Sequence, residues 1–340
     1  MDYIRNFKGW VASVVVLVAF LLIRMFSGGE TSYQESTGDK YSTFYSVTYK
    51  SDVDLSDSIA ILLDNFDYSL SPFNKNSILS SINNNDTSVR ADELLKNVIT
   101  LSHEVYVATS GAFDPTISPL INAWGFGFKT EKFPNAVEVD TLKTLVGMDK
   151  IMLSDDGRVV KANPNASLNF SAIAKGYIVD LIAKFLDKKG ITDYLVNIGG
   201  EINCKGVNPK GEEWRIGVDT PDESNIYGGD IHSVLQLTDK ALATSGNYRK
   251  YKVEDAQKVW HIIDPRTGYP TQARVLSATV VANSCAIADA YATALMVLGM
   301  EEGMSLIETD STLEAMFICP GDTTQYSVYY STGFKKYLKQ

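Results

Sequence analysis

Apolar side chains along the chain follow two periods, one helical and one strand-like. Residues 172–189 show the helical period most clearly, because Ile173, Tyr177 and Leu181 fall on one face and Gly190 ends the pattern. Similar spacing predicts further helices over residues 57–66, 91–110 and 284–298.

Alternating or short apolar runs predict the strands. They cover residues 41–50, 194–198, 201–205, 214–218, 233–237, 278–282, 316–319 and 326–330. Gly199-Gly200 separates two of these runs and predicts a hairpin. Helices and strands mix without strict β–α–β alternation, so we expect an α+β fold.

The first 40 residues have a different character. Residues 9–23 are uncharged and mostly apolar, and Arg5 and Lys8 precede them. This pattern predicts a membrane anchor, in preference to a cleaved signal peptide or a buried core helix, with the basic flank on the cytoplasmic side. We therefore expect an anchor over residues 1–26, a polar tether over 27–40 and a folded domain over 41–340.

Composition narrows the possible chemistry. The 340 residues carry 41 acids and 31 bases, a net charge of −10, which disfavours nucleic acid as a partner. Three cysteines and three histidines are scattered, so a disulfide framework or a zinc site is not expected, and a metal here would have oxygen ligands. The P-loop, Rossmann and serine-hydrolase sequence motifs do not occur in the chain.

One predicted helix carries a candidate cation site. Asp289 and Thr293 are four residues apart within residues 284–298, so their oxygens lie on one face. A carboxylate and a hydroxyl suit Mg²⁺, which completes its shell with phosphate and water. In the alternative interpretation Asp289 complements the helix dipole and Thr293 only packs.

Three other segments contain candidate site residues. His261 stands before the turn-forming residues 264–268 and can transfer a proton, or it is a structural histidine beside a turn. Asp114, after Ala112-Phe113, can accept hydrogen bonds from a heterocycle, or it forms an Asp-Pro turn.

Lys175 lies in the first turn of the helix predicted over residues 172–189. It can bind an anion there, or it is a solvated surface lysine. The adjacent Gly176 is costly inside a helix, which indicates that another part of the molecule approaches closely.

These segments, in this order, resemble the ApbE-type FAD:protein FMN transferases. The resemblance runs from about Thr43 to the C-terminal strands and includes Trp214-Arg-Ile-Gly217 and Val196–Glu201. It implies a T-fold-like α+β architecture, with mixed sheets and packed helices around an FAD cleft. It also implies Mg²⁺-dependent transfer of FMN from FAD to a threonine or serine of a partner flavoprotein, with release of AMP.

The resemblance also implies roles for individual residues. His261 matches the proposed base. The matched FAD contacts are Tyr41, Phe73, Ala112, Phe113, Asp114, Asn169, Lys175 and Ile263, and the matched magnesium ligands are Asp289, Thr293 and the main-chain carbonyl of Ala172. Tyr41, Phe73 and Asn169 depart from the residue types that the family usually has there.

Two other activities fit the same motifs. A Mg²⁺-dependent FAD pyrophosphatase would use water in place of the protein hydroxyl, and a non-catalytic exported protein would only bind FAD. With the predicted anchor, the resemblance implies a bacterial cytoplasmic-membrane protein whose catalytic domain faces the extracytoplasmic side and modifies an exported or membrane flavoprotein.

Overall fold

A large antiparallel sheet organises the computed structural model, which describes residues 32–127, 133–222, 229–247, 251–254, 257–272, 274–321 and 326–339. Its strands lie in the order β1 (Tyr33–Lys40), β2 (Thr43–Lys50), β5 (Tyr194–Ile198), β6 (Glu201–Lys205), β9 (Lys240–Gly246), β12 (Ser277–Ala282), β13 (Glu314–Pro320) and β14 (Tyr326–Tyr330). Each neighbouring pair is antiparallel.

The central strands of the sheet are buried on both faces, because successive side chains of a strand point to opposite faces and each face here meets a hydrophobic core. In β9, Ala241 and Ala243 join one hydrophobic core, and Leu242 between them joins a second core on the opposite face. In β13, Phe317 belongs to the first core and Met316 to the second.

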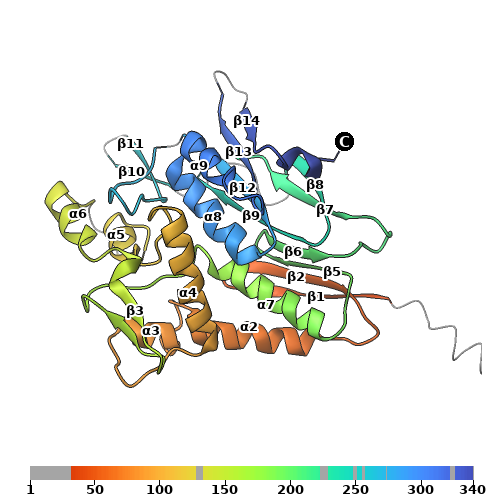
Figure 1. Cartoon of the computed structure of the whole chain (residues 1–340), viewed down its shortest axis with the longest axis horizontal. Coiled ribbons are helices and arrows are strands. Elements are labelled where there is room, and N and C mark those ends of the chain that lie inside the picture. The colour runs from red at the N-terminus through yellow and green to blue at the C-terminus, as the bar shows by residue number, and fades with distance from the viewer. Residues whose placement is uncertain are drawn as a thin grey trace, which may run out of the picture.

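Helices cover the first face (Figure 1). These are α2 (Ser56–Leu70), α7 (Ala174–Lys188), α8 (Cys285–Leu298) and α9 (Met300–Ile307), and α4 (Glu93–Ala108) packs against α2 and α8. The hairpin of β7 (Trp214–Asp219) and β8 (Ile231–Leu237), with η2 (Phe334–Tyr337), packs on the second core.

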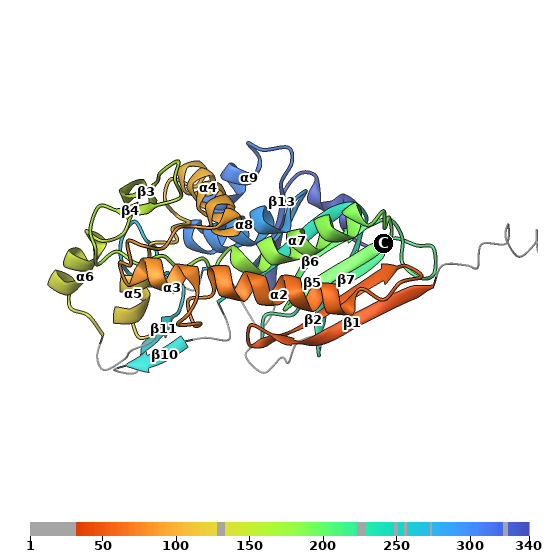
Figure 2. The same ribbon diagram turned by 90° about the horizontal axis from the view of Figure 1, so that it is seen from below.

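Smaller elements gather beyond one end of the sheet (Figure 2). They are α3 (Ile78–Asn83), α5 (Ser118–Ala123), α6 (Ala136–Lys143), η1 (Met148–Lys150), β3 (Ile151–Leu153), β4 (Val159–Lys161), β10 (Tyr251–Glu254) and β11 (Gln257–Trp260). A third apolar cluster, which includes Leu120, Trp124 and Ile263, holds part of this region together.

The α+β class and the strand–glycine–strand hairpin are confirmed, since β5 and β6 pair in register around Gly199-Gly200. The tether through residue 40 needs correction. Residues 33–40 form β1, because the next residues, Tyr41 and Ser42, adopt φ of 54° and 59° and fold the chain back onto β2.

The predicted anchor over residues 9–23 lies outside the described residues. Among the helices that the structure describes, none combines the length and apolar character needed to span a bilayer.

Candidate functional site

A cavity of about 810 Å³ opens where helices, strand ends and turns meet. The β5–β6 turn, the end of β9 and α8 form part of its lining, and residues 112–115, 117, 261–263 and 265 form another part. The cavity brings together most of the predicted site residues, namely Ala112, Phe113, Asp114, Asn169, Ala172, Lys175, His261, Ile263, Asp289 and Thr293.

Two predicted FAD contacts do not line this cavity. Tyr41 lies in the β1–β2 turn, where its hydroxyl donates to the carbonyl of Leu63 at 2.6 Å and its ring packs on Phe66. Phe73, after the end of α2, is 72% exposed. Their assignment as FAD contacts stays a prediction.

Asp289 is held by a neighbouring helix. Its Oδ2 accepts a hydrogen bond of 3.1 Å from the amide of Gly176 in the first turn of α7, and its side chain is buried. A Cβ on Gly176 would lie 2.2 Å from the carbonyl oxygen of Cys285, so only glycine permits this approach. The close approach predicted at Gly176 is therefore confirmed, and the approaching segment is the first turn of α8.

The bond between Gly176 and Asp289 also affects Ala172. In a regular helix the amide of Gly176 would donate to the carbonyl four residues earlier, which is that of Ala172. Because this amide donates to Asp289 instead, the Ala172 carbonyl at the cavity wall lacks that helical bond. The carbonyl is thus available to a cation.

Thr293 completes an all-oxygen donor set. Its hydroxyl lies one turn after Asp289 on α8, 3.2 Å from the Oγ of Ser245 at the end of β9. Carboxylate, hydroxyl and carbonyl donors fit Mg²⁺. The described residues contain no cluster of three His, Cys, Asp or Glu side chains arranged around a common metal position. A metal here would therefore be held by one carboxylate, one hydroxyl and one main-chain carbonyl.

Lys175 forms an ion pair with Glu201, the first residue of β6. The Glu201 side chain is buried, and its second carboxylate oxygen has no hydrogen-bond partner. Burial raises the pKa of Glu201 and also that of Asp289, while the nearby ammonium of Lys175 acts in the opposite direction on both. Two buried carboxylates therefore share one ammonium group, an arrangement that favours an added cation.

Residues 112–116 form a tight, buried segment. Asp114 Oδ1 accepts from the Thr116 amide at 2.8 Å and the Thr116 hydroxyl at 2.6 Å. The Thr116 hydroxyl accepts in turn from the Gly147 amide at 2.7 Å. Burial nevertheless raises the pKa of Asp114 to about 6, so this group changes charge just below neutral pH.

His261 is half-buried at the cavity, just before a hydrogen-bonded turn. The Gly268 amide donates to the Asp264 carbonyl at 2.8 Å, and the Trp124 indole donates to the Gly268 carbonyl at 2.8 Å. The ring of Phe126 meets the His261 ring edge-on, with centroids 6.3 Å apart. The turn predicted after His261 is confirmed, and it holds the histidine at the cavity wall.

Three further residues contribute to this region, and the sequence alone indicated no role for them. Glu201 pairs with Lys175, Ser245 contacts Thr293, and Phe44 is an exposed aromatic residue at the cavity. An acid placed directly after a glycine hairpin and before buried strand residues was a usable signal for Glu201. The sequence around Phe44 contains no comparable signal.

Comparison with known proteins agrees with this geometry. The ApbE family profile matches residues 41–317. The chain belongs to the ApbE family. An ApbE relative from Vibrio cholerae, named FAD:protein FMN transferase, is 32% identical over 340 residues that span 95% of this chain and 99% of the relative.

Solved ApbE structures share the fold. The flavin transferase ApbE from Vibrio cholerae superimposes with a TM-score of 0.79 at 33% identity, covering 90% of this chain and 99% of the other. The apo form of the Pseudomonas stutzeri flavinyl transferase ApbE gives a TM-score of 0.79 at 28% identity, covering 90% and 96%. The similarity to ApbE proteins thus extends across nearly the whole described fold.

Proposed function

We propose that this chain is an FAD:protein FMN transferase that uses Mg²⁺ and transfers FMN to a threonine or serine hydroxyl of an acceptor protein. One observation carries the proposal. A single cavity joins an oxygen donor set, a lysine and a histidine in a member of the ApbE family.

The α7–α8 side of the cavity would bind the diphosphate of FAD. Asp289, Thr293 and the Ala172 carbonyl would hold Mg²⁺, which supplies charge neutralisation at the diphosphate. Lys175 adds a positive charge beside them, and its pairing with Glu201 restricts where that ammonium lies. In an acidic protein these positive charges are needed to offset an anionic substrate.

Residues 112–114 and Ile263 would receive the flavin. Ala112 and Phe113 are buried in the hydrophobic core and also contribute to the cavity wall, where they offer an apolar surface to a flat ring. Asp114 beside them can accept hydrogen bonds from ring N–H groups. These residues would orient FAD with its diphosphate toward Lys175.

The transfer step needs a base, because a threonine hydroxyl is a weak nucleophile. His261 accepts the hydroxyl proton as the oxygen forms a bond to the FMN-side phosphorus. The bond from that phosphorus to the bridging oxygen breaks, and AMP leaves with the electron pair. The products are a phosphodiester-linked flavin on the acceptor and free AMP.

The cellular setting is part of the same proposal. The basic and apolar N-terminal residues support a bacterial membrane protein whose enzymatic domain lies on the extracytoplasmic side. The acceptor would then be an exported or membrane-bound flavoprotein.

The test combines the full chain with FAD, Mg²⁺ and an exported flavoprotein domain that has a threonine acceptor. We expect covalent flavin fluorescence on a denaturing gel and an acceptor mass increase of one FMN, both abolished by a chelator. Free FMN without labelled acceptor would instead identify a pyrophosphatase. FAD that binds and never turns over would identify a binding protein.

A further inference from the structure

Asp180 is a buried carboxylate in the middle of α7 that is not part of the cavity lining. Its oxygens accept four hydrogen bonds. The donors are the hydroxyl of Ser284 at 2.6 Å, the amides of Cys285 and Ala286 at 2.9 and 3.0 Å, and the side-chain amide of Asn203 at 2.9 Å. Asp180 therefore satisfies the free amides at the start of α8 from a neighbouring helix.

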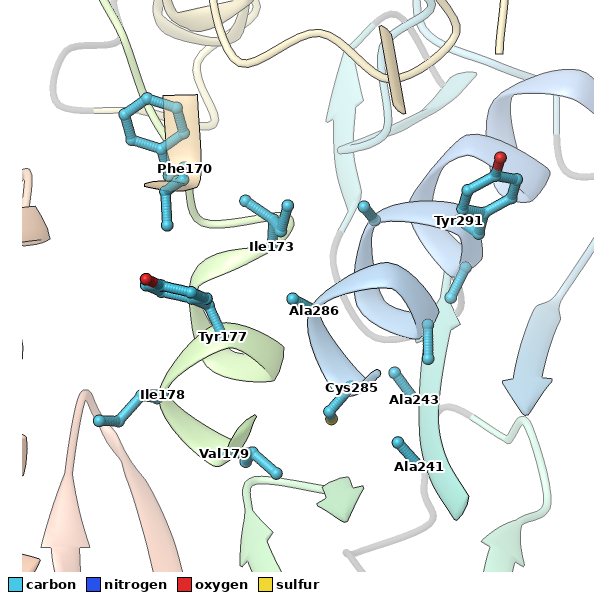
Figure 3. Packing of buried hydrophobic residues seen from close by; sticks show 14 of the residues in the cluster. Phe170, Ile173, Tyr177, Ile178, Val179, Ala241, Ala243, Cys285, Ala286 and Tyr291 are labelled. Atoms are coloured by element: carbon cyan, nitrogen blue, oxygen red, sulfur yellow. The ribbon is translucent and has the colours of Figure 1, made fainter. Parts of the chain in front are cut away.

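A second carboxylate makes the reciprocal contact. Asp289, one turn into α8, accepts from the amide of Gly176 in the first turn of α7. Each helix thus supplies a carboxylate to the N-terminal amides of the other. Figure 3 shows how close the two helices are, with Ala286 and Cys285 of α8 between α7 and strand β9.

The proposed cation site depends on this pairing of helices. The Ala172 carbonyl comes from the segment that leads into α7, while Asp289 and Thr293 come from α8. Thr293 lies about 12 Å along α8 from Cys285, where Asp180 binds. Because a regular helix is stiff, a shift of the first turn of α8 would also displace Asp289 and Thr293 relative to Ala172.

We propose that Asp180 is a positioning residue for the cation site, which fixes α8 against α7 so that Asp289 and Thr293 face the Ala172 carbonyl. The inference rests on the Mg²⁺ site of the proposed function. A carboxylate suits the task because both of its oxygens accept hydrogen bonds. An asparagine at position 180 would place an NH₂ group, which cannot accept a hydrogen bond, against two of the four donors.

The experiment measures binding of Mn²⁺ to the full chain without FAD, from the electron paramagnetic resonance signal of the free ion. Mn²⁺ takes the same oxygen ligands as Mg²⁺. We expect Asp180→Asn to weaken Mn²⁺ binding at least about tenfold at a temperature where circular dichroism shows the variant folded. The transfer rate should recover toward that of the parent at high Mg²⁺, since the reacting groups are intact.

Asp187→Asn is the matched control, because Asp187 lies two turns further along α7, is exposed and pairs with Lys205. It should bind Mn²⁺ like the parent. Unchanged Mn²⁺ affinity in folded Asp180→Asn would overturn the role of Asp180. If Asp289→Asn also leaves the affinity unchanged, the cation site itself fails, so the two failures are distinguishable.

A milder variant covers the case in which Asp180→Asn does not fold. Ser284→Ala removes one of the four donors to Asp180 and should weaken Mn²⁺ binding a few-fold. Parent-like affinity in folded Ser284→Ala, with Asp289→Asn defective, would again overturn the proposal.

Discussion

The two sides of the cavity differ in how they are built. The helix wall, formed by Ala172, Lys175, Asp289 and Thr293, belongs to the start of α7 and to α8, and it is tied together by the Gly176–Asp289 bond. The turn wall, formed by residues 112–114, 261–263 and 265, consists of loops held by side-chain bonds from Thr116 and Trp124.

This difference matches the demands of the chemistry. Charges buried against regular helices keep a fixed geometry, which binding a cation and a diphosphate requires. A half-buried histidine on a turn stays accessible to a hydroxyl that a second protein must bring in. We therefore expect substitutions in the helix wall to affect binding of the cation and the diphosphate, and substitution of His261 in the turn wall to affect the transfer step.

The largest effect is expected in the helix wall. Asp289→Ala should lower the initial rate of covalent flavin transfer about 10³-fold or more, because charge neutralisation by a metal is worth several kcal/mol. Gel fluorescence at saturating FAD and Mg²⁺ measures this rate. Asp187→Ala, at an exposed position near the C-terminal end of α7, should behave like the parent. A fall of less than tenfold in Asp289→Ala would argue against the metal role.

In the turn wall, His261→Ala should slow transfer by on the order of 10²–10³-fold through loss of the base. FAD affinity and Mn²⁺ affinity should stay near those of the parent, which distinguishes this variant from Asp289→Ala. His232→Ala is the control, since His232 lies on β8 and outside the cavity lining. Equal loss of FAD binding and of rate would contradict the division between the walls.

Asp114 should make stability depend on pH. Burial raises its pKa from 3.8 to about 6, so the folded protein holds this proton more tightly than the unfolded chain. The stabilisation is complete below pH 3.8 and is lost as the pH rises through 6, about 3 kcal/mol in total. Denaturant unfolding in EDTA between pH 4 and 6 should show a smaller loss for Asp114→Asn than for the parent.

The control residue for this pH dependence, Asp156, has a pKa that is lowered rather than raised. Hydrogen bonds from Ser154 and Arg158 lower the pKa of the exposed Asp156 to about 2, so its contribution is lost only at more acidic pH. Asp156→Asn should therefore leave the slope between pH 4 and 6 unchanged. An Asp114→Asn protein with the same slope as the parent would show that Asp114 titrates normally.

The smallest effect concerns the turn after His261. Trp124→Phe removes the indole bond to Gly268 and should lower the free energy of unfolding by about 1–2 kcal/mol. Trp214→Phe is the matched control, because the Trp214 indole donates to the Lys205 carbonyl at 2.9 Å and Trp214 belongs to the second core, away from the cavity lining. Both should lose similar stability in urea, and only Trp124→Phe should also slow transfer. If Trp124→Phe and Trp214→Phe transfer flavin at the same rate, the indole bond of Trp124 does not support the site.

Much of the site was predictable where its residues share one local element. Asp289 and Thr293 lie one helical turn apart, and both line the cavity as expected. Gly176 was recognisable as a site of close approach because glycine is unfavourable inside a helix. Even here the sequence did not show that the approaching segment was the start of α8.

Residues whose conformation depends on pairing with another segment were harder to predict from the sequence. The polar composition before residue 41 predicted a tether, but residues 33–40 pair with β2 because the chain reverses at Tyr41-Ser42. That reversal turns the Tyr41 side chain toward α2, where it packs on Phe66. Composition carries no information about such a pairing partner.

The sequence by itself determined the four longest helices, α2, α4, α7 and α8, most of the central strands and the hairpin at Gly199-Gly200. Periods of 3.6 and 2 residues and the conformational freedom of glycine are properties of short segments. Only the tertiary structure decided that Asp180 would meet the start of α8 and that Glu201 would pair with Lys175. Contacts between segments so far apart in the chain depend on how the whole core packs, which no local pattern records.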